Sequence, residues 1–166
     1  MMKKLFLLCA VSMLSFGVWA NMPYKATTEC EFDYDDFQFC SKSNIAKYKA
    51  ALAKRKPNYD STKILLNVGS AKNIRYVAID TQTGVVFPLR DTIYGFTDWK
   101  GSLKKPPLIQ FSISSPLLCV QGNIFAYRDA YDNVEVCYAL QKDQWAKYGQ
   151  EFRRTDIPKS LDKSVD

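Results

Sequence analysis

The sequence predicts an α+β fold that is mainly an antiparallel β-sheet, with one N-terminal helix and covalent disulfide staples. Short runs rich in β-branched and aromatic residues, separated by turn residues, follow one another from residue 62 onward. This pattern is typical of antiparallel sheets, not of alternating strands and helices. A helical spacing of apolar residues precedes it over 41–55. Five cysteines occur, four of them after an N-terminal leader, and this favours disulfides.

The leader has the features of a secretory signal peptide. A short basic start precedes an apolar run over residues 5–18, and Ala20 supplies the small side chain at a cleavage site. The run is shorter than the roughly 20 residues that span a bilayer, so we expect cleavage and not a membrane anchor. The protein is therefore predicted to be periplasmic or secreted.

The predicted organisation is a single globular domain between two other segments. Its length suits one hydrophobic core. The tail is polar and of mixed charge, so we expect it to be disordered. The segments are the signal peptide at 1–20, the domain at 21–152 and the tail at 153–166. Removing Lys3 and Lys4 with the leader lowers the net charge from +6 to +4.

The four remaining cysteines, Cys30, Cys40, Cys119 and Cys137, allow three disulfide pairings. We expect local pairing, Cys30 with Cys40 and Cys119 with Cys137, because the second pair flanks a predicted hairpin. The other pairings stay open at this stage. No two of these cysteines have the short spacing of zinc-ligand pairs, so we predict no metal site. The chain also has no phosphate-cradling glycine motif, and we predict no cofactor.

The N-terminal helix is predicted to begin at Ser41 or Ser43, whose hydroxyl can cap it, and to run to about Arg55. We expect its apolar face to carry Ile45, Tyr48 and Leu52. A second, short helix is predicted over 144–152. Residues 98–107 are expected to form a long exposed loop. The predicted strands are 62–68, 74–80, 85–89 with its extension at 92–96, 108–114, 117–120, 123–128 and 134–140.

The chain has no histidine, and this excludes every catalytic triad or metal site that needs an imidazole. The acidic and aromatic segment 29–39 could supply a glycosidase-type carboxylate pair, but a solvated, disulfide-closed loop explains it better. The two Ser-x-x-Lys matches, at Ser102 and Ser160, lie in a loop and in the tail, where that motif is expected by chance. We therefore predict no catalytic residue and no enzyme.

Two stretches resemble small uncharacterised secreted or periplasmic proteins of Gram-negative bacteria. They are VAIDTQTGVVFPL at 77–89 and CVQGNIFAYR at 119–128. The resemblance covers about a third of the mature chain and implies an exported bacterial setting. It implies no activity and no site residue.

A small, disulfide-stapled exported domain without histidine favours a binding or inhibitory, immunity-like role through contact with another protein, such as a toxin or a wall-acting enzyme. The candidate interaction residues are Trp99 and Lys100 in the exposed loop, and Lys47, Lys54, Arg55 and Lys56 on the helix. We expect a monomer that binds no nucleic acid and inserts stably into no membrane. The alternative is a wall-glycan binder or carbohydrate-active enzyme that uses the segment 29–39.

Overall fold

The computed structural model describes residues 37–126, 129–146 and 148–156. The predicted signal peptide and the acidic positions 29–36 lie outside these residues. No helix of the described part is long and apolar enough to cross a membrane. The described elements are α1 (Lys42–Lys54), β1 (Lys63–Asn67), β2 (Tyr76–Asp80), β3 (Val86–Pro88), β4 (Thr92–Tyr94), β5 (Phe96–Thr97), β6 (Leu103–Lys105), β7 (Leu108–Gln110), β8 (Leu118–Ala126), β9 (Asp129–Lys142) and β10 (Gln150–Asp156).

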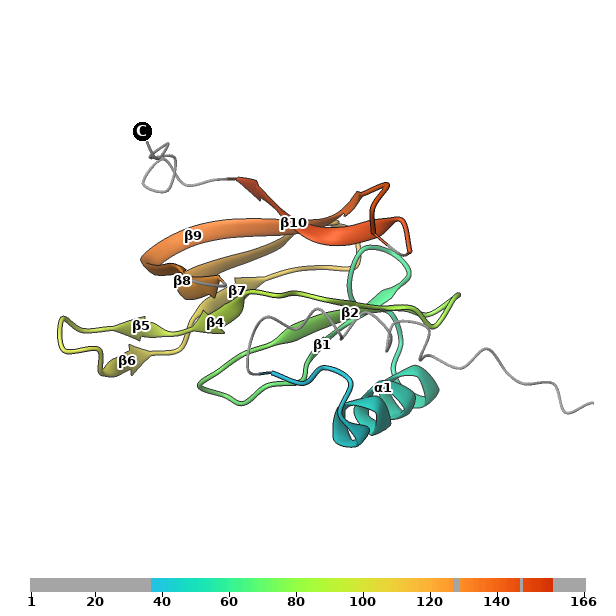
Figure 1. The fold of residues 1–166 in the computed structure, drawn as a ribbon, viewed down its shortest axis with the longest axis horizontal. Helices are drawn as coiled ribbons and strands as arrows, with labels where there is room; N and C mark the ends of the chain where they lie inside the picture. Colours follow the sequence, from blue (N-terminus) through green and yellow to red (C-terminus); the bar gives the residue numbers. More distant parts are fainter. Residues whose placement is uncertain (1–36, 127–128, 147, 157–166) are drawn as a thin grey trace, which may run out of the picture.

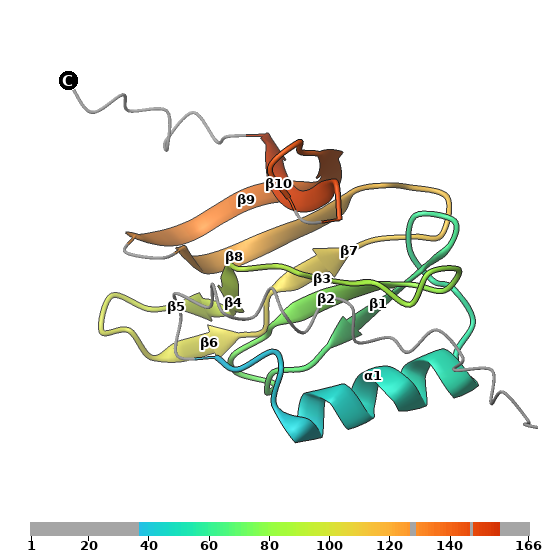
Figure 2. The same cartoon turned by 45° about the vertical axis from the view of Figure 1, so that its right-hand side comes forward.

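These elements form three layers. A three-stranded sheet has the order β1-β2-β3, and a larger sheet has the order β10-β9-β8-β4, with β7 also paired to β8. Figures 1 and 2 show the smaller sheet in the middle, with the larger sheet on one side and α1 on the other. Successive β2 residues Val77, Ala78 and Ile79 are all 0% exposed, because both faces of the middle layer are covered. The strand pairs are antiparallel, so the predicted fold class is confirmed in its main part.

The predicted helix is confirmed and begins after Ser41. The Ser41 hydroxyl accepts a hydrogen bond from the Asn44 amide at 3.3 Å, which satisfies a backbone donor that the helix leaves unpaired. Arg55 has an extended backbone and ends the helix. Pro57 follows in sequence and restricts the residue before it to extended conformations.

The buried face of α1 differs from the predicted one. It carries Asn44, Tyr48 and Ala51, while Ile45 and Leu52 lie at its border and are half-buried. The polar members are satisfied: Asn44 Nδ2 donates to the Gln38 carbonyl at 3.0 Å, and the Tyr48 hydroxyl donates to the Phe39 carbonyl at 2.8 Å. These hydrogen bonds to residues 38 and 39 hold Asn44 and Tyr48 on the buried face, so that face is not the purely apolar one that the sequence predicts.

The predicted strands at 62–68, 74–80 and 85–89 correspond to β1, β2 and β3. The turn between β2 and β3 uses Gly84 at φ 70°, and its amide donates to the Asp80 carbonyl at 2.8 Å. β3 lies at a sheet edge, where a proline such as Pro88 is tolerated. Residues 92–96 do not extend β3, however. Their first part is β4, which pairs with β8 in the larger sheet.

The β8–β9 hairpin carries the predicted Cys119–Cys137 disulfide, which is confirmed. The two cysteines face each other directly in the strand register. Cys40 is also disulfide-bonded, and its predicted partner Cys30 lies outside the described residues.

The prediction of a strand over 108–114 with a buried apolar face is wrong beyond Gln110, where β7 ends. Phe111 and Ile113 are exposed. The chain leaves the sheet here because its carbonyls bind another segment: the Asp60 amide donates to Ser112 and the Ser61 amide donates to Ile113. These bonds replace the ladder that would have continued the strand.

The prediction of a short helix over 144–152 is also wrong. Residues 144–146 and 148–149 are in turns and bends, where the Asp143 carboxylate accepts from the Trp145 amide at 2.8 Å and Gly149 has φ 71°. β10 then begins at Gln150 and runs to Asp156, so the predicted domain boundary at 152 divides a strand. Phe152, whose spacing suggested a helix, lies in β10 and stacks on Tyr59, with ring centroids 6.3 Å apart. Residues 157–166 of the predicted tail lie outside the described part.

Candidate functional site

Residues 95–107 interrupt an edge strand of the larger sheet. Tyr94, the last residue of β4, pairs with Asn123 of β8, and Leu108, the first residue of β7, pairs with Gln121. β4 and β7 are therefore two halves of one edge, and the segment between them leaves the sheet as the β5–β6 pair. We call residues 95–107 the projecting hairpin, because Figures 1 and 2 show β5 and β6 extending beyond both sheets.

Two glycines allow the hairpin to leave the sheet at this point. A Cβ on Gly122 would lie 2.4 Å from the Tyr94 carbonyl oxygen and 3.1 Å from Pro107 Cβ. A Cβ on Gly95 would lie 2.1 Å from the Lys105 carbonyl oxygen. Any side chain at either position would push the two arms of the hairpin apart. The base of the hairpin is therefore held to one narrow geometry.

Asn123 attaches the hairpin to the sheet. Its side chain is 3% exposed, and its Nδ2 donates to Thr97 Oγ1 at 2.7 Å. Its Oδ1 accepts from the Asn133 amide at 2.8 Å. Asn133 has φ 53° at a register shift of the β8–β9 pair. One buried amide thus connects the hairpin, β8 and β9, and both of its ends are satisfied.

The carboxylate of Asp98 organises the tip. It accepts hydrogen bonds from the backbone amides of Lys100 and Ser102, each at 2.9 Å, and pairs with the Lys104 ammonium at 2.9 Å. The hydrogen bond from Lys104, followed by those from Ser102 and Lys100, holds the pKa of Asp98 below its ordinary value. Gly101 supplies the positive φ, 77°, that the turn requires. These contacts within the turn therefore fix the conformation of the tip.

The hairpin presents apolar side chains accompanied by lysines. Trp99 at the tip is 89% exposed, and Lys100 Nζ lies 4.8 Å from its ring centroid. Nearer the sheet, Lys105 Nζ lies 4.0 Å above the ring of Phe96, and Leu103 is exposed. Both ammonium groups are at cation–π distance from an aromatic face. The predicted residues Trp99 and Lys100 therefore lie together on one exposed surface.

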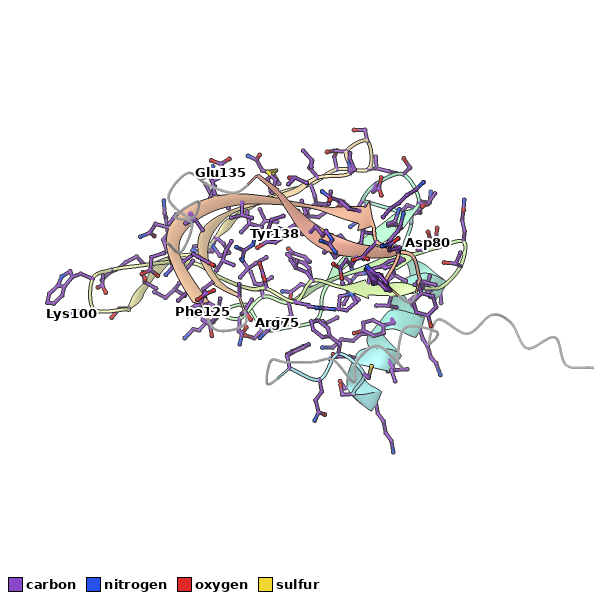
Figure 3. All side chains as sticks on the ribbon, turned by 45° about the horizontal axis from the view of Figure 1, so that its top comes forward. Arg75, Asp80, Lys100, Phe125, Glu135 and Tyr138 are labelled. Atoms are coloured by element: carbon purple, nitrogen blue, oxygen red, sulfur yellow. A yellow bond between two sulfur atoms is a disulfide. The ribbon has the colours of Figure 1, made fainter. Side chains whose placement is uncertain are left out.

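Further apolar surface lies where the hairpin joins the sheet. Phe125 is exposed and packs edge-to-face on Tyr94, with centroids 4.9 Å apart. Leu108 is exposed as well. Figure 3 shows Phe125 near the body of the protein and Lys100 at the far end of the hairpin. These residues were missed from the sequence because they are brought to the base of the hairpin by the pairing of β4 and β7 with β8, which no local pattern reports.

The basic residues predicted on the helix do not join this surface. α1 lies in the opposite outer layer (Figures 1 and 2). Lys54, Arg55 and Lys56 are exposed there. Lys47 is engaged within the fold, since its ammonium donates to the Val68 carbonyl at 3.0 Å and to Asn44 Oδ1 at 3.1 Å. The structure therefore divides the predicted interaction residues into two separate sets.

The described part of the acidic and aromatic segment is structural. Phe39 is in the core, and Phe37 lies between the Phe39 ring, 4.8 Å away, and the Arg75 guanidinium, 5.4 Å away. The carboxylates proposed for a glycosidase-type pair lie outside the described residues. Within residues 37–126, 129–146 and 148–156, no group of three or more potential ligand side chains could hold a metal ion.

One partly buried carboxylate, Asp91, is bound to two side chains of the larger sheet. It accepts from the Tyr138 hydroxyl at 2.7 Å and from Arg154 Nη2 at 2.7 Å. Burial, together with the negative charge of Asp91, raises the pKa of Tyr138. The Arg154 guanidinium also stacks on the Tyr131 ring at 4.9 Å. This network joins β9 and β10 to the chain just before β4, and its groups are engaged with one another.

No protein-family model matches the chain, and comparisons with curated proteins and with solved structures find no match. The projecting hairpin is the feature of this fold whose geometry bears on function. That geometry combines an ordered tip, an exposed indole and adjacent ammonium groups, which are groups suited to surface recognition.

Proposed function

We propose that this chain is an exported binding protein that recognises another protein through the projecting hairpin, and that it acts by occupying its partner's surface without catalysing a reaction. An inhibitory, immunity-like role against a toxin or a wall-acting enzyme fits this mode of action. The observation that carries the proposal is Trp99, almost fully exposed at the tip of a hairpin that the fold holds in place. Tryptophan is among the residues that contribute most at protein interfaces.

The order of the tip supports the proposal energetically. Association costs the ordering of loops and side chains at the interface, and a loop that is already ordered avoids much of that cost. The Asp98 hydrogen bonds, the Asn123 attachment and the close approach at Gly95 supply this order in the free protein. Replacing an interface tryptophan of this kind by alanine reduces the free energy of binding by about 2 kcal/mol or more, which raises Kd roughly thirty-fold.

The proposal of export is supported by the predicted leader and by the Cys119–Cys137 disulfide. Disulfides persist in oxidising compartments such as the bacterial periplasm. A cross-linked sheet that carries a rigid hairpin also suits a protein that acts outside the cytoplasm.

The chain offers a matched control for Trp99. Trp145 is 87% exposed at the turn between β9 and β10, at the other end of the larger sheet. The immobilised wild-type chain, Trp99→Ala and Trp145→Ala would be incubated with periplasmic extract at physiological salt. We expect wild type and Trp145→Ala to retain the same protein in stoichiometric amount, and Trp99→Ala to lose it.

Calorimetry with the purified partner would then measure the difference, expected to be about thirty-fold or more between wild type and Trp99→Ala. Recovery of no partner, or of one that Trp99→Ala retains as well as wild type does, would refute the proposed function. Equal loss with both variants would show that any exposed indole gives nonspecific retention.

A further inference from the structure

We propose that the partner surface contacted by the projecting hairpin is acidic, with carboxylates arranged around an apolar contact site for Trp99. This inference rests on the proposed function and names the chemistry of its partner. It follows from the position of the lysine ammonium groups relative to the aromatic rings.

An interface that buries the Trp99 ring also removes water from a cation. Lys100 Nζ lies 4.8 Å from the ring centroid, so a partner that covers the indole covers or closely borders the ammonium. A buried, unpaired charge is strongly unfavourable, and the partner must supply an anion to compensate. A partner that covers Phe96 would likewise remove water from Lys105, whose Nζ lies 4.0 Å from the ring centroid.

The hairpin has no free acidic side chain to supply that anion itself. Residues 95–107 contain three lysines and one acid, Asp98. Asp98 is already engaged with Lys104 and with two backbone amides of its own turn. Lys100 and Lys105 therefore contribute a local excess of two positive charges, which favours association with a negative surface.

Carboxylates of a protein fit this tip better than phosphates of a lipid surface. The large exposed apolar side chains of the hairpin itself are Trp99 at the tip and Leu103 nearer the sheet, while Leu108 and Phe125 lie at its base on the sheet. A single indole on a narrow turn matches a recess in a folded or peptide partner, while stable attachment to a bilayer needs a broad apolar face. Binding to anionic lipid is therefore an outcome that the experiment must separate from binding to protein.

The probe is a random library of disulfide-constrained peptides displayed on phage, selected on the immobilised, oxidised chain. Enriched peptides would be synthesised, and their affinity measured at low and high salt. We expect them to be rich in aspartate and glutamate around an apolar residue, and to lose their affinity for Trp99→Ala. Vesicles of phosphatidylethanolamine and phosphatidylglycerol provide the lipid arm, in which we expect no sedimentation of the chain.

Matched charge reversals test the lysines. Lys100→Glu/Lys105→Glu changes the net charge as much as Lys54→Glu/Lys56→Glu, which alters exposed residues at the end of α1. We expect the hairpin pair to weaken peptide binding at least tenfold at low salt, with a smaller effect at high salt, and the helix pair to leave it within about twofold. The conservative pair Lys100→Arg/Lys105→Arg should bind like wild type.

The outcomes distinguish this inference from the proposed function. Trp99-dependent peptides that are neutral or basic, or affinities unchanged by the hairpin reversals, would overturn the acidic partner while leaving protein recognition standing. If the helix reversals weakened peptide binding as much as the hairpin reversals, net charge alone would explain the effect, and the acidic partner surface would be overturned. Enrichment of no Trp99-dependent peptide would count against the proposed function itself. Trp99-dependent sedimentation with the vesicles would show that the hairpin binds a lipid surface, and it would overturn the acidic protein partner.

Discussion

Removing the Cys119–Cys137 bond by substituting both residues with alanine should lower the free energy of unfolding by about 3 kcal/mol. The bond joins residues separated by 18 positions. For a loop of this length, the entropy that a cross-link removes from the unfolded chain amounts to about 3 kcal/mol at 25 °C. The folded state should change little, because the β8–β9 ladder on either side of the bond, such as Val120 with Val136, does not depend on it.

Urea unfolding followed by circular dichroism would measure the difference, and thermal melting should show a fall in Tm of roughly 10 °C. Substitution is preferable to a reducing agent, since Cys40 is disulfide-bonded as well and would be reduced at the same time. Trp99-dependent binding should survive in the variant, because the hairpin joins β8 beyond the bond. A loss below about 1 kcal/mol would refute the account based on the unfolded chain.

Three further predictions concern the hairpin and the carboxylate network. Gly95→Ala places a methyl group against a backbone carbonyl, so we expect a stability loss of roughly 1–3 kcal/mol in urea unfolding and a reduced capture of the Trp99-dependent partner; unchanged stability would contradict the close approach. In urea unfolding, Asp91→Ala should lower the free energy of unfolding by about 3 kcal/mol, because the Arg154 guanidinium and the Tyr138 hydroxyl lose their shared partner. Tyr138→Phe, which removes one of these two hydrogen bonds, should lower it by about 1–2 kcal/mol. Equal losses would contradict the assignment of Asp91 as the group that binds both side chains. The pKa of Asp98 is lower in the folded hairpin than its ordinary 3.8, so its stabilisation of the tip is fully present above that value and is lost as the pH falls through the lower folded value. In a Trp145→Phe chain without residues 1–20, Trp99 is the single tryptophan left. Its fluorescence anisotropy should stay constant from about pH 6 to pH 4 and fall only below, and an earlier fall would contradict the assignment.

The sequence was sufficient where local chemistry decides the structure. Ser41 caps α1, Gly84 turns β2 into β3, and the cysteines at the ends of a predicted hairpin are bonded. Each of these features depends on a few neighbouring residues whose preferences agree with the fold. Local agreement of this kind is what makes an element predictable.

The sequence failed where contacts between distant segments override a local pattern. The alternation at 108–114 indicated a strand, but hydrogen bonds from Asp60 and Ser61 draw residues 112 and 113 away from the sheet. The aromatic spacing at 144–152 indicated a helix, but Phe152 packs in a strand against Tyr59. Periodicity describes what a segment can do alone, and here the tertiary contacts are stronger.

The candidate site was predicted only in part. Exposure of Trp99 and Lys100 followed from the proline and glycine content around them. The separation of these residues from the lysines of α1, and the joining of β4 and β7 into one interrupted edge, both depend on sheet order. Sheet order is set by pairings far apart in sequence, which a single sequence does not reveal.

The interrupted edge has a consequence for how this fold can change. Because Tyr94 and Leu108 pair with β8 residues only two positions apart, Asn123 and Gln121, the ends of the inserted segment lie close together. Such a segment can be lengthened, shortened or exchanged while the three layers keep their packing. Under the proposed function, altering this one loop would give the scaffold a new target, in the way that variable antibody loops diversify on a constant framework.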